Sequence, residues 1–190
     1  MRPVIHLLAL AAGLFWAGCS GAGRGYPVQK LDGATTTLRP APGTRGWLFV
    51  FLGVECPIAN RCLPELLELE REFTGAGVRF CYVYPNPDET PELIRRHQAD
   101  YGLTGEVFRD PELRLARQLG ASKTPEAVFL DATGQLIYRG RINDQFLALG
   151  QGKPAPTRRD LADALALFRA GTPPTGLVQP PVGCTFRSLP

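Results

Sequence analysis

Histidine is scarce in this sequence, and charge is not concentrated anywhere along it. Its two histidines, His6 and His97, exclude a metal site built from several histidines and a catalytic scheme that needs several candidate bases. The 21 basic and 18 acidic residues, with a formal net charge of +3, include no basic block, so binding to nucleic acid is not indicated. The five cysteines are therefore where chemistry must be sought.

The composition is that of a folded domain. The 21 glycines and 18 prolines make up about a fifth of the 190 residues, below the roughly 25–30% that is typical of low-complexity chains. Hydrophobic residues account for 44% and charged residues for 21%, which are ordinary values for a globular core. No internal repeat is found, and the length leaves room for one domain after processing.

The apolar segment at the N-terminus is too short to cross a bilayer. Val4 to Ala17 has 14 residues, whereas a membrane-spanning helix needs about 20. Because it follows the positive Arg2, the segment is typical of the apolar core of a signal peptide, which we expect over residues 1–18.

The residues before Cys19 resemble the lipobox of bacterial lipoproteins, in which the cysteine is lipidated and becomes the new N-terminus. Trp16 stands where that motif usually has leucine. The resemblance implies a lipid anchor on Cys19 that binds the membrane, with a flexible tether over residues 19–25. Ordinary signal cleavage near Gly18 or Gly21 is the alternative. Either route predicts an extracytoplasmic domain, on the periplasmic side, where disulfides persist.

Strand and helix patterns alternate along the rest of the chain. In order, we expect strands over 26–31 and 35–38, a buried strand over 47–52, a helix over 57–73 kinked at Pro64, a strand over 78–84, a helix over 91–101, a helix from Asp110-Pro111 to Gly120, an antiparallel pair over 126–131 and 135–141, and a last helix that begins with a capping pair, Thr157 and Asp160, and ends at Gly171. The alternation indicates an α/β fold with helices on both faces of a sheet. We expect one domain over residues 26–171 and a Pro-rich tail over residues 172–190.

Cys56 stands where a buried strand ends and a helix begins, with Pro57 at the first helical position. A thiol there faces unsatisfied backbone N–H groups and the positive end of the helix dipole. Both stabilise the thiolate, so we expect a pKa below the roughly 8.5 of a free cysteine and a reactive sulfur. The alternative interpretation is an inert core thiol.

The surroundings of Cys56 resemble the thioredoxin superfamily. Members of that superfamily carry a nucleophilic cysteine after an apolar strand, with a helix-kinking proline at the spacing of Cys56 and Pro64. Their cis-proline loop, which precedes a strand, is matched by Lys123-Thr124-Pro125-Glu126. The resemblance covers about residues 26–170 and implies a thioredoxin-like fold, with a central mixed β-sheet and helices on both faces. It also implies a cis Thr124–Pro125 bond in an active-site loop near Cys56.

A closer resemblance is to extracytoplasmic redoxins of the AhpC/TSA-like, peroxiredoxin-like class. Four runs carry it: Cys56 to Arg61, Arg139 to Ile142, Pro154 to Arg158, and Gly183-Cys184. It implies a thiol–disulfide or peroxiredoxin-like oxidoreductase that uses Cys56 as its nucleophile and needs no cofactor or metal. Its partners would be a protein thiol or disulfide, or a small oxidant, together with an electron donor.

The sequence departs from these relatives near the thiol. Ala59 replaces the second cysteine of thioredoxins, and Gly53 stands where peroxiredoxins have threonine. The peroxiredoxin arginine ahead of the hairpin strand is displaced by Pro125 and its neighbours. Since these losses remove donors that stabilise a peroxide in the transition state, the expectation of efficient peroxidase activity is weakened.

The remaining thiols, Cys62, Cys81 and Cys184, allow three complete pairings with Cys56. Six helical residues rise about 9 Å, beyond the roughly 7 Å limit for a disulfide, so a Cys56–Cys62 bond requires the first helical turn to unwind. Otherwise Cys62 packs the helix, and Cys81 is expected to be a buried strand thiol. We prefer Cys184 as the resolving partner of Cys56, because the extended tail could cover roughly 40 Å. A tail bond to Cys62 and a free Cys184 are the alternatives.

Two other functions use the same fold. A copper carrier needs a second cysteine four residues after the first and a distant histidine, but Asn60 occupies the first of these positions. His97 falls on a stripe with Leu93, Ile94 and Tyr101, so we expect it to be packed rather than to bind a metal. A redoxin scaffold that binds a partner without turnover is the other alternative. Arg139 and Arg141 alternate on a strand, and we expect both to point to one solvated face.

Overall fold

The computed structural model describes residues 25–187. The predicted signal peptide, Cys19 and all but the last residue of the predicted tether lie outside the described residues. The elements are β1 (Tyr26–Gln29), β2 (Thr35–Leu38), β3 (Gly46–Phe51), α1 (Pro57–Phe73) with a 3-10 turn (Thr74–Ala76), β4 (Val78–Tyr84), α2 (Pro91–Tyr101), β5 (Glu106–Arg109), α3 (Arg114–Leu119), β6 (Lys123–Thr124), β7 (Glu126–Asp131), β8 (Leu136–Gly140), β9 (Phe146–Ala148), β10 (Gln151–Gly152), α4 (Asp160–Arg169), β11 (Leu177–Val178) and β12 (Cys184–Thr185). Within this range, no helix is both long and apolar enough to cross a membrane.

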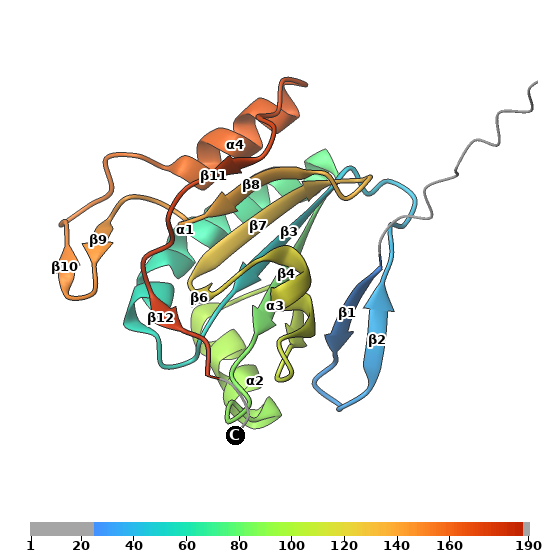
Figure 1. Cartoon of the computed structure of the whole chain (residues 1–190), viewed down its shortest axis with the longest axis vertical. Helices are drawn as coiled ribbons and strands as arrows, with labels where there is room; N and C mark the ends of the chain where they lie inside the picture. Colours follow the sequence, from blue (N-terminus) through green and yellow to red (C-terminus); the bar gives the residue numbers. More distant parts are fainter. Residues whose placement is uncertain (1–24, 188–190) are drawn as a thin grey trace, which may run out of the picture.

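An eight-stranded mixed sheet forms the centre of the molecule, in the order β11-β8-β7-β3-β4-β5-β1-β2 (Figure 1). β3, β4 and β5 run parallel to one another, whereas β7 runs antiparallel to both β3 and β8. Every residue of β3 is buried, which is typical of a central strand covered on both faces.

Helices cover both faces of this sheet. Because successive strand side chains point to opposite faces, Leu48 and Val50 of β3 pack with residues of α1, α2 and α4. Trp47 and Phe49 pack on the other face with α3 and the β1–β2 hairpin. In Figure 1, α1 and α3 accordingly lie on opposite sides of the sheet. The predicted α/β class with a central mixed sheet is confirmed.

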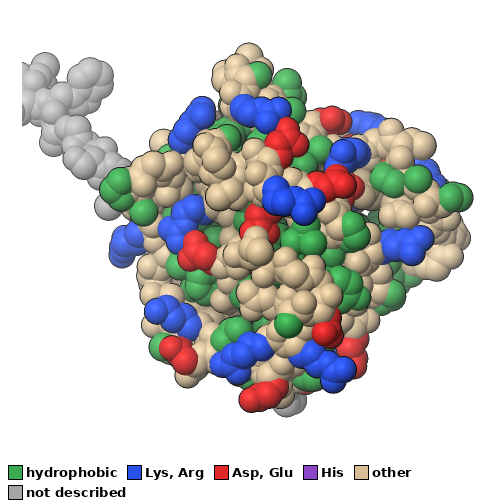
Figure 2. Space-filling model, turned by 180° about the vertical axis from the view of Figure 1, so that it is seen from behind, with side chains coloured by type: hydrophobic (Ala, Val, Ile, Leu, Met, Phe, Trp, Pro, Cys, Tyr) green, Lys and Arg blue, Asp and Glu red, His purple; other side chains and the backbone are tan. Residues whose placement is uncertain are grey.

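The surface seen from behind carries interspersed acidic and basic side chains (Figure 2). Ion pairs join α4 and the residue before it to α1: Arg159 contacts Glu65 and Glu68 at 2.9 and 3.0 Å, and Arg169 contacts Glu72 at 2.8 Å. Exposed pairs of this kind contribute about 1 kcal/mol or less. The apolar residues beneath α4 therefore supply most of its attachment to the sheet.

The predicted boundaries of α1 and α2 are confirmed, but those of α3 are wrong at its start. Asp110 begins a turn rather than the helix, because Leu113 has a left-handed φ of 54° and interrupts helical geometry. The Asp110 carboxylate instead accepts hydrogen bonds from the N–H groups of Leu115 and Ala116, at 3.2 and 2.8 Å. The strand β5 was not predicted, since it is only 4 residues long with one buried side chain.

Two further predictions near the last helix are wrong. Thr157 does not cap α4, which begins at Asp160, because its hydroxyl and N–H both bond to the Asp144 carboxylate. Arg139 and Arg141 do not share a face. Arg139 donates to the carbonyl of Leu119 at the end of α3, whereas Arg141 pairs with Asp160 of α4 on the other side of the sheet. Gly140 separates the two with a φ of 142°.

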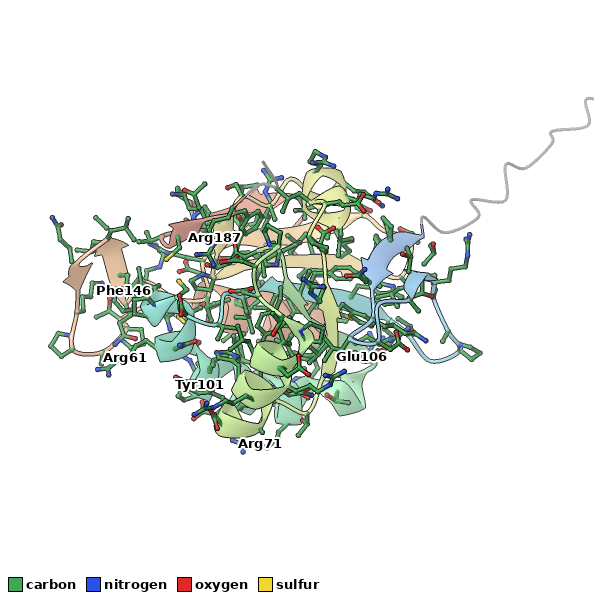
Figure 3. The ribbon with its side chains drawn as sticks, turned by 90° about the horizontal axis from the view of Figure 1, so that it is seen from below. Arg61, Arg71, Tyr101, Glu106, Phe146 and Arg187 are labelled. Carbon is green, nitrogen blue, oxygen red and sulfur yellow. The ribbon has the colours of Figure 1, made fainter. Side chains whose placement is uncertain are left out.

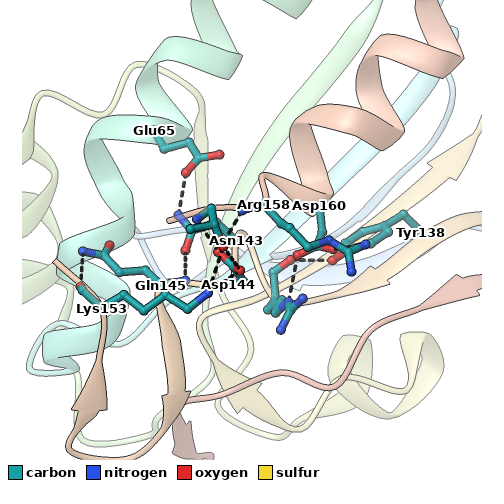
Figure 4. A network of polar contacts seen from close by, with 10 residues as sticks. Glu65, Tyr138, Asn143, Asp144, Gln145, Lys153, Arg158 and Asp160 are labelled. Atoms are coloured by element: carbon teal, nitrogen blue, oxygen red, sulfur yellow. Dashed lines mark hydrogen bonds and ion pairs between the residues drawn. The ribbon is translucent and has the colours of Figure 1, made fainter. Parts of the chain in front are cut away.

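The Asp144 carboxylate fixes the base of the β9–β10 hairpin (Figure 4). It accepts hydrogen bonds from Thr157, from the N–H of Arg158 and from the Lys153 ammonium. The Lys153 and Thr157 hydrogen bonds hold the pKa of Asp144 well below its usual range. Next to it, Asn143 donates to Glu65 of α1. The hairpin is thus tied to α1 and to the segment before α4.

The segment after α4 lies along the domain. β11 adds a parallel strand to β8, and the N–H of Gln179 donates to the carbonyl of Arg139 at 2.9 Å. β12 then pairs antiparallel with β6, with Cys184 opposite Thr124. Phe186 packs on Phe51 of the central strand, with ring centroids 5.5 Å apart. The chain therefore crosses the molecule and brings Cys184 next to the loop that precedes β7.

Candidate active site

Cys56 occupies the N-cap of α1, with an extended backbone (φ −82°, ψ 107°) and only 4% of its surface exposed. Pro57 begins the helix, and the N–H of Asn60 donates to the Cys56 carbonyl at 3.0 Å. The apolar strand β3 delivers the cysteine to the edge of the sheet, and the proline starts the helix directly after it. The sulfur therefore lies where the first N–H groups of α1 are free of helical partners.

Cys184 lies against Cys56. The Cys184 thiol donates a hydrogen bond to the Cys56 sulfur, with 3.1 Å between the two Sγ atoms. Both thiols are free. Since a disulfide bond measures about 2.05 Å, a shift of about 1 Å would bring the sulfurs to bonding distance. The two residues are 128 positions apart in the sequence, so the tertiary fold creates this pair.

The two sulfurs differ in acidity. Burial raises the pKa of the Cys56 thiol, but hydrogen bonds to its sulfur outweigh burial and leave the pKa lowered. The donors are the side chains of Thr124 and Cys184 and the backbone N–H groups of Ala59 and Cys184. Burial and the neighbouring Cys56 sulfur raise the pKa of Cys184 to about 11. Cys56 is thus the more acidic thiol of the pair, and Cys184 is the less acidic one.

The loop between β6 and β7 covers Cys56. The Thr124–Pro125 bond is cis, as predicted, and the Cys56 thiol donates to the Thr124 carbonyl at 3.0 Å. The buried Glu126 carboxylate accepts hydrogen bonds from the N–H groups of Ser122 and Lys123 at 2.7 and 3.1 Å. Glu126 therefore holds this loop in place over the thiol.

Gly183 explains why the tail can approach this loop so closely. A Cβ at this position would overlap the Thr124 carbonyl, so only glycine fits at position 183, where the tail lies against the strand β6. Past the cysteine, Arg187 fastens the chain: its N–H donates to Asn86, and its guanidinium pairs with Asp88, both at 3.0 Å.

A hollow of about 170 Å³ opens beside the two sulfurs. We call it the polar hollow; its lining residues are Gly53, Glu55, Cys56, Asn86, Glu89, Thr124, Cys184, Thr185 and Arg187. A Cβ on Gly53 would lie 3.2 Å from Thr124 Oγ1 and 3.3 Å from Cys56 Cβ. A threonine at position 53 would therefore crowd the thiol.

A second depression, of about 460 Å³, lies on the other side of Cys184. We call it the hairpin groove; it is lined by Pro57, Ile58, Arg61, Gln145, Phe146, Leu149, Gly150, Gly152, Lys153 and Cys184. Figure 3 shows Arg61 and Phe146 at the same end of the molecule, where α1 meets the β9–β10 hairpin. Leu147 and Leu149 at the hairpin tip are 60% and 65% exposed.

Cys62 and Cys81 lie apart from this chemistry. α1 is continuous from Pro57 to Phe73, so its first turn is not unwound toward a Cys56–Cys62 bond. Burial, with the nearby negative charge of Glu65, raises the pKa of Cys62 to about 12. Cys81 is fully buried in the middle of β4, and burial raises its pKa well above the usual range.

Sequence reasoning missed the role of Asn60 and His97. His97 is buried and packed, as predicted, and both ring nitrogens are engaged: Nδ1 with the Tyr84 hydroxyl and Nε2 with Asn60 Oδ1, each at 2.8 Å. The Asn60 amide donates in turn to the Val54 carbonyl at 3.0 Å. These bonds brace the loop that presents Cys56. No group of three potential metal ligands exists among residues 25–187.

Glu89 and Asn86 were also missed, although a signal was present. Both follow β4, which runs parallel to β3, so the carboxyl ends of the two strands meet at one edge of the sheet. Polar residues after one such strand lie beside the cysteine that follows the other. The sequence NPDET, residues 86–90, just after the apolar strand could have indicated them.

The comparisons with known proteins agree with this geometry. A family model described as Redoxin matches residues 25–145. Two solved structures similar to most of the chain are a hypothetical protein from Sinorhizobium meliloti (21% identity, TM-score 0.74, 88% of this chain and 93% of that chain) and an uncharacterized conserved protein from Geobacillus kaustophilus (20%, 0.76, 89% and 91%). A secreted disulfide oxidoreductase of Mycobacterium tuberculosis, homologous to E. coli DsbE, is similar at 18% identity and TM-score 0.54, covering 74% of this chain and 94% of that chain. A search of curated proteins finds no match. These likenesses establish the thioredoxin-like fold.

Proposed function

Since the chain belongs to the Redoxin family, we propose that it is a thiol–disulfide oxidoreductase in which Cys56 is the nucleophile and Cys184 the resolving thiol. Family membership supports a redox function in general. The observation that carries the proposal is the pair of Sγ atoms 3.1 Å apart. One member of this pair has a lowered pKa and the other a raised pKa.

The reaction begins with attack of the Cys56 thiolate on one sulfur of a substrate disulfide. A mixed disulfide forms, the substrate disulfide breaks, and the first substrate thiolate leaves. The Cys184 sulfur then attacks Cys56 Sγ, which forms the Cys56–Cys184 bond and releases the second substrate thiolate. The substrate gains two electrons and the enzyme loses them. A dithiol donor restores both cysteines, and the reverse sequence oxidises a dithiol substrate.

A protein disulfide or dithiol fits the site better than a small peroxide. Gly53 supplies no side-chain donor beside the thiol, whereas peroxide reduction relies on such donors. The hairpin groove leads to Cys184 and has apolar walls in Ile58, Phe146 and Leu149. An extended polypeptide that carries a cysteine can lie there while its sulfur reaches the thiol pair.

The proposed site of action is outside the cytoplasm, on the periplasmic side, with Cys19 lipidated and bound to the membrane. The apolar segment before Cys19 supports this location. Disulfide exchange is also favoured there, because cytoplasmic thiols are kept reduced. The similar structure from M. tuberculosis belongs to a secreted disulfide oxidoreductase.

Disulfide mapping tests the proposed function. The reduced protein is treated with one equivalent of oxidised glutathione and quenched with acid, and its peptides are then identified by mass spectrometry. We expect a Cys56–Cys184 peptide in the wild type and a Cys56–glutathione adduct in Cys184→Ser. Cys62→Ser serves as the matched control and should behave as the wild type. Recovery of Cys56 bonded to Cys62, or of unmodified Cys56, would refute the assignment.

A further inference from the structure

Glu89 is a carboxylate buried beside the thiol pair. It is only 3% exposed and lines the polar hollow with Cys56 and Cys184. Its Oε1 accepts hydrogen bonds from the Val54 N–H at 2.8 Å and from the Asn86 amide at 3.0 Å. Its Oε2 is buried and has no hydrogen-bond partner among the described residues.

An unpartnered carboxylate oxygen in this position is costly. Leaving a buried polar group without a partner costs about 1–3 kcal/mol, and more for a charged group. Burial accordingly raises the pKa of Glu89, although the hydrogen bonds from Asn86 and Val54 and the positive Arg187 act in the other direction. A carboxyl group of this kind exchanges its proton closer to neutral pH than an exposed one.

The second chemical step requires such a group. Cys184 must lose its proton to attack Cys56, and burial raises the pKa of the Cys184 thiol. The negative charge of Cys56 is gone once Cys56 is in the mixed disulfide, but burial still disfavours the Cys184 thiolate in the resolving step. The leaving thiolate of the substrate, in contrast, takes up a proton in the same step.

We propose that Glu89 is the proton carrier of the resolving step, accepting the proton of Cys184 as its sulfur attacks Cys56 and passing it to the departing substrate thiolate. The proposal rests on the proposed function. The proton balance closes, because Glu89 ends the step in the state in which it began. The hollow of about 170 Å³ gives Glu89, Cys56 and Cys184 a shared space through which a proton can move.

Other charged groups around the hollow do not replace Glu89. Glu55 lines it from the loop before α1, but its side chain is exposed. Asp88, which precedes Glu89, forms an ion pair with Arg187 at 3.0 Å. Arg187 and Lys123 are cations that lower the pKa of Cys184 without accepting its proton.

The test separates the two chemical steps with the aromatic disulfide dithiobis(nitrobenzoate), which releases a coloured thiolate at each step. This thiolate stays ionised, so in the assay Glu89 passes the proton of Cys184 to solvent. Attack by Cys56 releases the first equivalent, and attack by Cys184 on the mixed disulfide releases the second. Stopped-flow absorbance follows the release of both equivalents between about pH 5 and pH 9. The substitution is Glu89→Gln, whose amide oxygen can still accept from Val54 and Asn86. Glu55→Gln, on the same hollow, is the matched control.

We expect Glu89→Gln to leave the first phase within about twofold and to slow the second by about a hundredfold, since general bases typically contribute 10²–10⁴-fold. Its second phase should follow only the ionisation of Cys184 and should be accelerated by imidazole buffer, which supplies a base from solution. Glu55→Gln should match the wild type. A Glu89→Gln second phase with wild-type rate and pH profile would overturn this inference alone. A wild type that releases a single equivalent would overturn the proposed function and the inference with it.

Discussion

Cysteine side chains at the edge of the sheet and in the interior of the domain differ in acidity. Cys56 caps the N-terminus of α1 and Cys62 lies in its second turn, and they are almost equally buried, with 4% and 3% of their surfaces exposed. The pKa of Cys56 is nevertheless lowered, whereas burial raises that of Cys62 to about 12. The N-cap sulfur faces hydrogen-bond donors, and the sulfur nearly two turns further on faces helix and core. Donors around the sulfur, rather than exposure, decide the difference in acidity.

The second pair of cysteines repeats the contrast. Cys81 is enclosed in the middle of β4, where both faces of the strand are packed. Cys184 comes from a two-residue strand on the rim and contacts the Cys56 sulfur directly. The edge therefore holds two sulfurs in contact, for which we propose reactivity, and the interior holds two packing residues. The four predictions below test this division, from the largest expected effect to the smallest.

Alkylation should separate the edge from the interior by more than about a thousandfold. At pH 7, a thiol with a pKa near 12 is ionised in about one molecule in 10⁵, and only the thiolate reacts. Because the pKa of Cys56 is lowered, its alkylation rate should reach half of its maximum at a lower pH than that of an unperturbed cysteine. Pulses of iodoacetamide on the reduced native protein, read by peptide mass spectrometry, measure each rate. Rates for Cys56 and Cys62 within tenfold of each other would contradict the comparison.

Serine substitution should lower the stability more in the interior than at the edge. Cys81→Ser places a hydroxyl in the apolar core without a partner and should lower the free energy of unfolding by about 2 kcal/mol. Cys184→Ser on the rim should change it by about 0.5 kcal/mol or less. Urea unfolding of both reduced variants, followed by tryptophan fluorescence, gives the two values. An equal loss for both variants would mean that the rim is packed as tightly as the interior.

Gly183→Ala should weaken the edge pair without removing either sulfur. The added Cβ overlaps the Thr124 carbonyl, and crowding of this kind costs about 1–3 kcal/mol. We expect β12 to shift from β6 and formation of the Cys56–Cys184 bond to slow by about tenfold. Gly75→Ala is the control, because no atom lies within 4 Å of a Cβ at that position. Unchanged kinetics in Gly183→Ala would show that the tail approaches Cys56 by another route.

The smallest effect should come from a substitution in the hairpin groove. Leu149→Asp places a charge in the hairpin groove and should reduce kcat/KM for a protein disulfide about threefold to fivefold, as expected for a contact worth less than about 1 kcal/mol. The rate with oxidised glutathione should not change. Leu167→Asp is a matched control, since Leu167 is a 44% exposed leucine on α4 away from the groove. Equal losses for both oxidants would place the effect on Cys56 rather than on substrate binding.

Part of this site could be predicted from the sequence because the signals are local. An apolar run, a cysteine, a proline at the first helical position and glycines past its end place Cys56 at a helix N-terminus without long-range information. The boundaries of α1 and α2 follow from the same signals, and their prediction is confirmed. The cis bond at Pro125 came from resemblance to a family, since its local sequence permits either isomer.

The tertiary structure alone decided which distant residues meet Cys56. Glu89 comes to the thiol pair because β3 and β4 end at the same edge, and Cys184 because two short strands attach the tail to β8 and β6. Thr157 could not be predicted to bond Asp144 rather than cap α4, since both partners satisfy the same donors. Local pattern determined where the nucleophile stands on its helix. Contacts between residues far apart in the chain determined its acidity and its partner, because hydrogen bonds and packing depend on position in space.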